Sequence, residues 1–190
     1  REGSLDRAET YLEQALDLYM ELYGENKNHI NIAAVKFQQG ALAHQREQWE
    51  QAYNHFFACL CIRRNVYAYA RPVGKEDEEN PTHLEISCVL HELACMAFAQ
   101  GYFSQAVGTL KSERIILARL EETSDHHTEK IYQNRLTNLT WLRKCAKGMG
   151  EEEMATEYSN ERSSLKQSIL TNTKKVDVKE EGMLSLIHIS

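Results

Sequence analysis

Proline and glycine are scarce in this sequence, which has two prolines and nine glycines among its 190 residues. An all-β fold needs many tight turns, and such turns draw on both residue types. Long hydrophobic runs are missing too, because no stretch approaches the roughly 18 consecutive apolar residues of a membrane span. The sequence therefore favours helices, and we expect no membrane partner.

Positively charged residues are also fewer than negatively charged ones. The chain has 22 Lys and Arg against 28 Asp and Glu, which gives a formal net charge of −6. A nucleic-acid-binding protein needs a basic face, so we expect no direct nucleic-acid partner. Apolar residues make up 42% of the chain and charged residues 26%, which is normal for a soluble, folded protein.

Cysteines are too irregular to form a disulfide framework. The five cysteines are an odd number and include no C-x-x-C pair. Small buried thiols in a reducing compartment are the simpler interpretation, so we expect a cytoplasmic protein. No signal peptide is visible, but the chain starts at Arg1 rather than Met. We therefore expect a fragment whose natural N-terminus is missing.

Motifs of catalysis are absent as well. The sequence has no Gly-rich phosphate loop, no G-x-S-x-G and no H-E-x-x-H. Its acidic runs, at residues 75–80 and 150–153, look like solvated loop and helix-start charges. Paired carboxylates for acid–base work need a shaped pocket, and nothing in the sequence marks one. We predict neither an enzyme nor a bound cofactor.

What the sequence does contain is a repeated pattern. Three segments share it and align on an alanine: residues 3–18 on Ala8, residues 47–62 on Ala52 and residues 101–116 on Ala106. A bulky apolar residue stands three positions before each alanine (Leu5, Trp49, Phe103) and another stands four positions after it (Leu12, Phe56, Leu110). These offsets share one face of an α-helix. The alanine at its centre would let a second helix approach closely.

A second apolar helical pattern precedes two of these segments, at residues 36–46 and 90–100. Each unit then consists of a helix, a tight turn and another helix. Such a hairpin cannot bury its apolar face alone and must stack on its neighbours. The sequence therefore predicts an all-α fold of stacked antiparallel helix hairpins over residues 1–150.

The spacing of the alanines locates an insertion. Ala8 and Ala52 are 44 residues apart, whereas Ala52 and Ala106 are 54 apart. The excess of ten residues falls at about residues 66–82, after the second segment.

Histidines at the junctions between units keep the same spacing. His29 and His83 are 54 residues apart, and His83 and His127 are 44 apart. Within the insertion, Asn80 is predicted to cap the next helix with Pro81 at its first position.

These features resemble the tetratricopeptide repeat, in the long form found in kinesin light chains, nephrocystin-type proteins and the clustered-mitochondria family. The A-x3-F element of the repeat matches Ala52 and Phe56, and its L-G/A element matches Leu93-Ala94. The pattern departs at Glu113-Arg114, where Ala-Leu is expected. The resemblance implies a right-handed superhelix with a concave groove.

The last part of the chain fits the repeat less well. Leu139, Leu142, Ala146 and Ala155 keep its pattern. We expect a degenerate final helix at residues 151–171 and a disordered tail at residues 172–190. Residues 184–190 resemble the translation of a sequencing adapter, so they are left out of the fold prediction.

The resemblance also implies which residues face the groove: Phe37, Ala41, His44, Gln45, His91, Cys95, Phe98, Thr140 and Lys144. The expected partner is a peptide or helix of another protein, with Phe37 and Phe98 as aromatic anchors. The alternative is that these two rings only pack helix on helix.

A metal site is an alternative to this peptide-binding groove. Cys88, His91 and Cys95 share one helical face and could meet His44 of the neighbouring helix, which would supply four ligands for zinc. Residues 125–127, Asp-His-His, are a second candidate. Helix-borne Cys and His are more often packing residues, so no metal is predicted.

The resemblance leaves two functions open. One is an adaptor or scaffold that binds a peptide in its groove, as kinesin light chains bind cargo. The other is a structural segment of a larger clustered-mitochondria-like protein, whose RNA or ribosome association would come from other domains. Helix 4–22 is also expected to show an open apolar face that could support oligomerisation.

Overall fold

The computed structural model describes the backbone of residues 2–24, 26–69, 82–123 and 128–187. These residues form seven helices and no strand: α1 (Glu2–Tyr23), α2 (Ile30–Gln45), α3 (Trp49–Tyr69), α4 (Leu84–Ala99), α5 (Phe103–Thr123), α6 (Thr128–Gly148) and α7 (Glu152–Ile187). The prediction of an all-α fold is confirmed.

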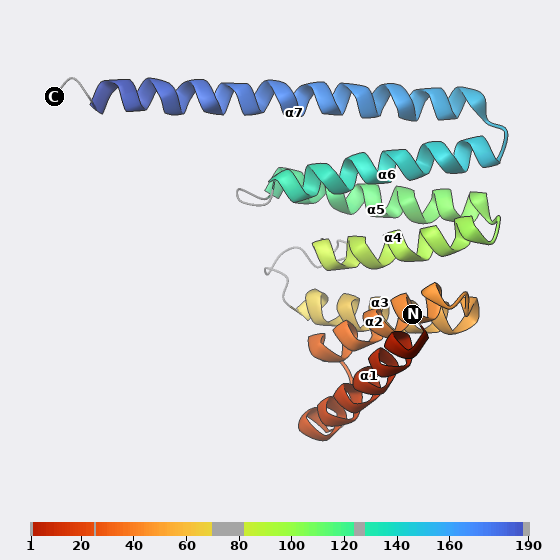
Figure 1. The fold of residues 1–190 in the computed structure, drawn as a ribbon. Helices are drawn as coiled ribbons and strands as arrows, with labels where there is room; N and C mark the ends of the chain where they lie inside the picture. Colours follow the sequence, from red (N-terminus) through yellow and green to blue (C-terminus); the bar gives the residue numbers. More distant parts are fainter. Residues whose placement is uncertain (1, 25, 70–81, 124–127, 188–190) are drawn as a thin grey trace.

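The helices pair into antiparallel hairpins that stack on one another (Figure 1). Helix α2 packs against α3, α4 against α5, and α6 against α7. Neighbouring hairpins meet where α3 contacts α4 and where α5 contacts α6, and α1 packs obliquely on α2. This is the superhelical stack of hairpins that the repeat pattern predicts.

The three hairpin turns share one geometry. In each, one residue has a left-handed φ: 58° at Glu47, 80° at Gly101 and 78° at Gly150. The next residue donates its N–H to the carbonyl of an alanine five positions earlier: Gln48 to Ala43 at 2.9 Å, Tyr102 to Ala97 at 2.8 Å, and Glu151 to Ala146 at 2.9 Å. This is the Schellman motif, which satisfies the last carbonyls of a helix. It ends α2, α4 and α6 in the same way.

A buried alanine lies five residues after each left-handed residue. Ala52, Ala106 and Ala155 are almost fully inaccessible to solvent, so the predicted burial of Ala52 and Ala106 is confirmed. Ala8, predicted to be equivalent, is only half-buried. Its helix α1 packs on α2 but has, among the described residues, no hairpin partner of the kind that α2 provides for α3.

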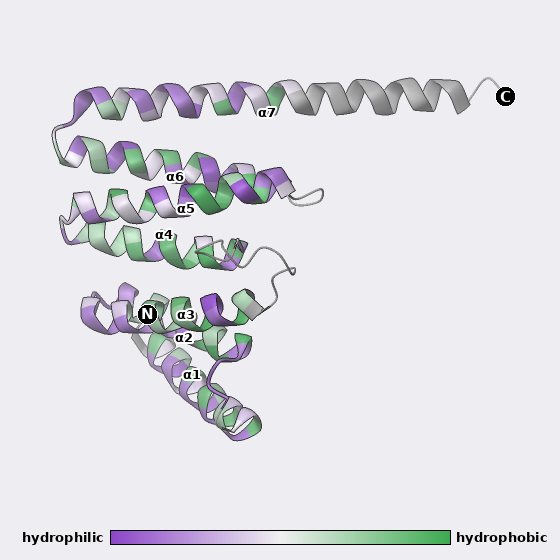
Figure 2. Cartoon of the chain, turned by 180° about the vertical axis from the view of Figure 1, so that it is seen from behind, coloured by the Kyte–Doolittle hydropathy of each residue, from purple (hydrophilic) through white to green (hydrophobic). Residues whose placement is uncertain are grey.

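Two hydrophobic cores lie on either side of α4. The first joins α2, α3 and α4 around Phe56 and Ile86. The second joins α4 to α5, α6 and α7 around Leu110 and Leu142. Hydrophobic residues run along most of α4 (Figure 2), because this helix supplies side chains to both cores.

Helices α2 and α4 each begin directly after a histidine. The Nδ1 atoms of His29 and His83 accept hydrogen bonds from the N–H groups of Asn31 and Glu85, at 3.2 Å in both cases. Each imidazole therefore satisfies a donor that a helix start leaves unpaired. The repeated histidine spacing marks helix starts.

The predicted start of α4 is wrong. The helix begins at Leu84 with His83 as its cap, whereas the sequence predicts a start at Pro81 capped by Asn80, and both of these residues lie outside the described ranges. Helix α3 continues to Tyr69, so it includes the first residues of the insertion predicted at about 66–82, whose bounds stay a prediction. Asn is among the most favoured cap residues, whereas an imidazole is not a usual cap acceptor.

The C-terminal helix is longer than predicted. α7 continues to Ile187, whereas a disordered tail is predicted from residue 172. The segment has no proline and only one glycine, so nothing in it stops a helix. The adapter-like origin of residues 184–190 stays a prediction. No helix in the described part of the chain has both the length and the apolar character needed to cross a membrane.

Candidate functional site

The first helices of the three hairpins, α2, α4 and α6, share one face of the stack, which we call the inner face. A shallow pocket of about 190 Å³ opens there, lined by Phe37 of α2, by Cys88, His91 and Glu92 of α4, by Glu113 of α5, and by Asn134 and Thr137 of α6. One ligand in this pocket would touch three successive hairpins.

A buried ion pair forms the floor of the pocket. The Nδ1 of His91 lies 3.1 Å from the Oε2 of Glu113, whose side chain is only 2% exposed. Asn138 donates from Nδ2 to the same carboxylate oxygen at 2.8 Å and to the carbonyl of Leu110 at 2.9 Å. The departure from the repeat pattern at Glu113 is thus a polar link between α4, α5 and α6.

Burial alone would lower the pKa of His91. Hydrogen bonds to Cys95 and Glu113, together with the charge of Glu113, outweigh it and raise the pKa to about 10. His91 is therefore an imidazolium at neutral pH. A buried charge is tolerated where it is paired and hydrogen-bonded, as it is here.

The two predicted aromatic anchors are partly built into the walls of the groove. Phe37 packs edge-on against Phe56 with ring centroids 5.4 Å apart, and the guanidinium of Arg63 lies 5.2 Å from its ring centre. Phe98 lies 5.2 Å from Trp141 and 5.3 Å from Phe103, measured between ring centroids. Both rings are half-buried, so each supports the helix packing while part of it stays accessible.

Most of the predicted groove residues lie outside the lining of the inner pocket. Of the nine, only Phe37 and His91 line the inner pocket. Lys144 places its ammonium 4.1 Å from the centre of the Trp141 ring, and the hydroxyl of Thr140 donates to the carbonyl of Leu136.

The other four predicted residues also lie outside the lining of the inner pocket. Ala41 packs against the first core and Gln45 is exposed. The Nδ1 of His44 is 3.8 Å from Glu92, and Cys95 is half-buried, one turn after His91 on α4. The role of all nine residues in binding a partner stays a prediction.

The structure does not bring the four candidate zinc ligands together. Cys88, His91, Cys95 and His44 do not converge, and no group of three or more metal-ligating side chains occurs in the described part of the chain. His91 and His44 face carboxylates instead. The Asp-His-His candidate at residues 125–127 lies outside the described ranges.

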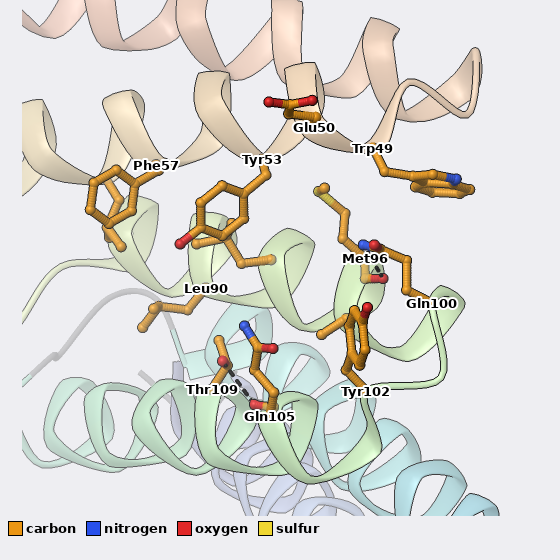
Figure 3. Close-up of a pocket in the computed structure, with 13 residues that line it drawn as sticks. Trp49, Glu50, Tyr53, Phe57, Leu90, Met96, Gln100, Tyr102, Gln105 and Thr109 are labelled. Carbon is orange, nitrogen blue, oxygen red and sulfur yellow. Dashed lines mark hydrogen bonds between the residues drawn. The ribbon is translucent and has the colours of Figure 1, made fainter.

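A larger groove, which we call the outer groove, has no counterpart among the residues predicted from the sequence. It has a volume of about 630 Å³ and lies between α3 and α5, over α4. Trp49, Tyr53 and Phe57 of α3 line it, as do Leu90 and Met96 of α4 and Tyr102, which directly precedes α5 (Figure 3). The signal was present as three aromatics at i, i+4 and i+8, a helical stripe of their own beside the alanine face.

The aromatic side chains of this outer groove are open to solvent. Tyr53 and Phe57 stack with ring centroids 5.8 Å apart and are 44% and 48% exposed, and Tyr102 is 59% exposed. Glu50 is the one charged residue among those that line the groove.

Comparison with known proteins supports the fold. No protein-family model matches the chain, and no curated protein matches it. Among solved structures, the chain is similar to "BtubC (BKLC) from P. vanneervenii", with a TM-score of 0.67 and 13% sequence identity. The match covers 88% of this chain and 58% of that one, so this chain spans little more than half the length of its structural relative. At this identity the likeness concerns the helical-repeat fold alone.

Proposed function

We propose that this chain is a non-catalytic interaction module, of adaptor or scaffold type, which binds a peptide or helix of a partner protein on its inner face. The observation that carries the proposal is the inner pocket, to which α2, α4 and α6 each contribute. Stacked helical repeats create extended concave surfaces of this kind. The long form of the tetratricopeptide repeat is the family that we propose for the chain.

The chemistry of the pocket suggests what would bind. Phe37 offers part of an aromatic ring and Asn134 offers an amide, whereas the hydroxyl of Thr137 donates to the carbonyl of Gln133. The charge of His91 is already balanced by Glu113, and Glu92 adds a second carboxylate at the rim. A peptide with an apolar anchor and a neutral or basic neighbour fits this surface better than an acidic one.

The test is selection of peptides from a displayed library on the whole chain, followed by affinity measurements. Thr137 is exposed on α6, so Thr137→Arg should fill the pocket without disturbing the fold and weaken binding about tenfold or more. Gln51→Arg, on the exposed side of α3, is the matched control and should leave the affinity unchanged. If no peptide is enriched, or if both variants bind equally well, the inner face is not the binding site.

A further inference from the structure

The outer groove, defined by the lining of α3, α4 and α5 described above, is a second surface separate from the inner pocket. Exposed aromatics from two hairpins converge on it, Tyr53 and Phe57 from α3 and Tyr102 from the turn between α4 and α5 (Figure 3). Scattered apolar residues are normal on a protein surface, whereas a hollow where several large ones meet marks a binding site. We propose that this groove binds a short amphipathic helix of a partner protein, with a Lys or Arg at the end that lies near Glu50.

The polar groups of the groove favour a helix over an extended peptide. An extended backbone needs hydrogen-bond partners when it is buried. Here the amide of Gln100 donates to the carbonyl of Met96 at 3.3 Å, and the hydroxyl of Thr109 donates to that of Gln105 at 3.1 Å. These two groups are engaged with backbone carbonyls. The Gln105 amide, the tyrosine hydroxyls and Glu50 remain, which are fewer groups than the successive N–H and C=O groups of an extended backbone need. A helical ligand satisfies its backbone internally and can present only side chains to the groove.

The length of the groove sets the length of the ligand. Its lining on α3 runs from Trp49 to Leu60, which corresponds to about 16 Å of helix at the usual rise per residue. A partner helix of about three turns, lying along α3, would match this span. Leu or Met side chains at i, i+3, i+4 and i+7 would then reach between the aromatic walls.

The negative charge of Glu50 determines which end of the ligand helix lies beside it. Glu50 is exposed at the same end as Trp49, and the rest of the lining is apolar or uncharged. A basic residue at that end of the ligand meets an opposite charge, whereas an acidic one is repelled. An exposed pair of this kind contributes modestly to affinity, so the aromatic contacts should dominate.

The experiment uses two synthetic 14-residue peptides held helical by a lactam bridge. Both carry four Leu on one face and differ in one terminal residue, Lys or Glu. Fluorescence anisotropy with the whole chain should show the Lys peptide binding about threefold tighter than the Glu peptide. Glu50→Lys should reverse that order. Phe57→Ser and Tyr53→Ser should each weaken both peptides about tenfold.

Tyr11→Ser is the matched control, because Tyr11 is an exposed aromatic on α1, outside the groove, and it should leave both affinities unchanged. Thr137→Arg should also have no effect, which separates this groove from the inner face. Thermal melting of each variant establishes that it is folded. Equal losses in Tyr11→Ser and Phe57→Ser, or an unchanged peptide preference in Glu50→Lys, would overturn the proposal.

Discussion

The imidazole of His83 stacks on the ring of Tyr67, with centroids 3.6 Å apart and planes 12° apart. His29 stacks on Tyr23 in the same way, at 3.6 Å and 18°. In both pairs the tyrosine lies in the last turn of one helix, α1 or α3, and the histidine caps the helix that follows, α2 or α4. The ten-residue insertion lies between Tyr67 and His83, so the contact is kept while the chain between its two residues lengthens.

Loss of the His83 cap should destabilise the junction between α3 and α4. His83→Ala removes the acceptor for the N–H of Glu85 and should lower the free energy of unfolding by about 1 kcal/mol. His83→Asn keeps a cap acceptor and should retain much of that stability. Urea denaturation of both variants measures the difference, and equal loss in both would show that ring stacking, not capping, matters there.

Acid should weaken the same junction. Burial lowers the pKa of His83, and the opposing charge of Glu85 does not reverse this. The folded state then binds fewer protons than the unfolded state, so stability is present above the unfolded pKa of about 6.5 and falls as the pH drops through it. Wild type should therefore lose more stability than His83→Asn between pH 7.5 and pH 5.5, measured as melting temperature. If the melting temperatures of the two proteins fall equally with pH, protonation of His83 is not the cause of the acid sensitivity.

The ion pair of His91 and Glu113 should give stability the opposite pH dependence to that of His83, with stability lost as the pH rises into the alkaline range. Because the pKa of His91 is raised to about 10, its contribution is fully present below about pH 6.5 and is lost as the pH rises towards 10. Glu113→Gln should remove most of this slope and cost on the order of 2 kcal/mol at pH 7, since His91 loses the carboxylate that favours its charged form and a charge-assisted hydrogen bond becomes a neutral one.

Glu92→Gln is the control for that prediction. Glu92 lines the same pocket but contacts His44 rather than His91. Melting curves at pH 7 and pH 10 should show the wild-type slope in this variant and a flatter one in Glu113→Gln. The same slope in all three proteins would mean that another group titrates.

The left-handed turn at Glu47 offers a stabilising substitution. Gly101 and Gly150 hold the equivalent positions, and a non-glycine residue with positive φ is strained. Glu47→Gly should therefore raise the free energy of unfolding by about 0.5–1 kcal/mol. Gly101→Ala should lower it by a similar amount, because the φ of Gly101 is 80°.

Gly108→Ala tests whether the loss of a glycine, rather than the positive φ, explains the destabilisation expected for Gly101→Ala. Gly108 lies within α5 with open space around its Cα, so alanine there should stabilise the helix by about 1 kcal/mol. Opposite signs at positions 101 and 108 would assign the cost to backbone conformation. Destabilisation at both would contradict it.

The sequence was most informative where the pattern is local. The alanines at 52 and 106, the turns before them and the burial of Leu139, Leu142, Ala146 and Ala155 all follow from helical spacing within one hairpin. Periodicity reports which face of a helix is apolar, but not what covers it. Ala8 has the right spacing and yet stays half-buried, because burial also depends on a partner helix.

Contacts between distant segments were harder to predict. Glu113 was recognised as a departure from the pattern, but its partners His91 and Asn138 stand 22 and 25 residues away. The outer groove likewise depends on how α3 and α5 are spaced across α4. A helical stripe of aromatics cannot by itself distinguish a buried face from an open groove.

Close packing between α2 and α3 should make Gly40 intolerant of a side chain. A Cβ at this position would lie 2.8 Å from the ring of Phe56, and overpacking of a tight core costs about 1–3 kcal/mol. Gly40→Ala should therefore destabilise the chain, although alanine favours a helix more than glycine does. In a double-mutant cycle, Phe56→Leu should reduce the cost of Gly40→Ala, because it removes the ring that the new methyl group meets. Strictly additive effects in urea denaturation would show that the two residues are not in contact.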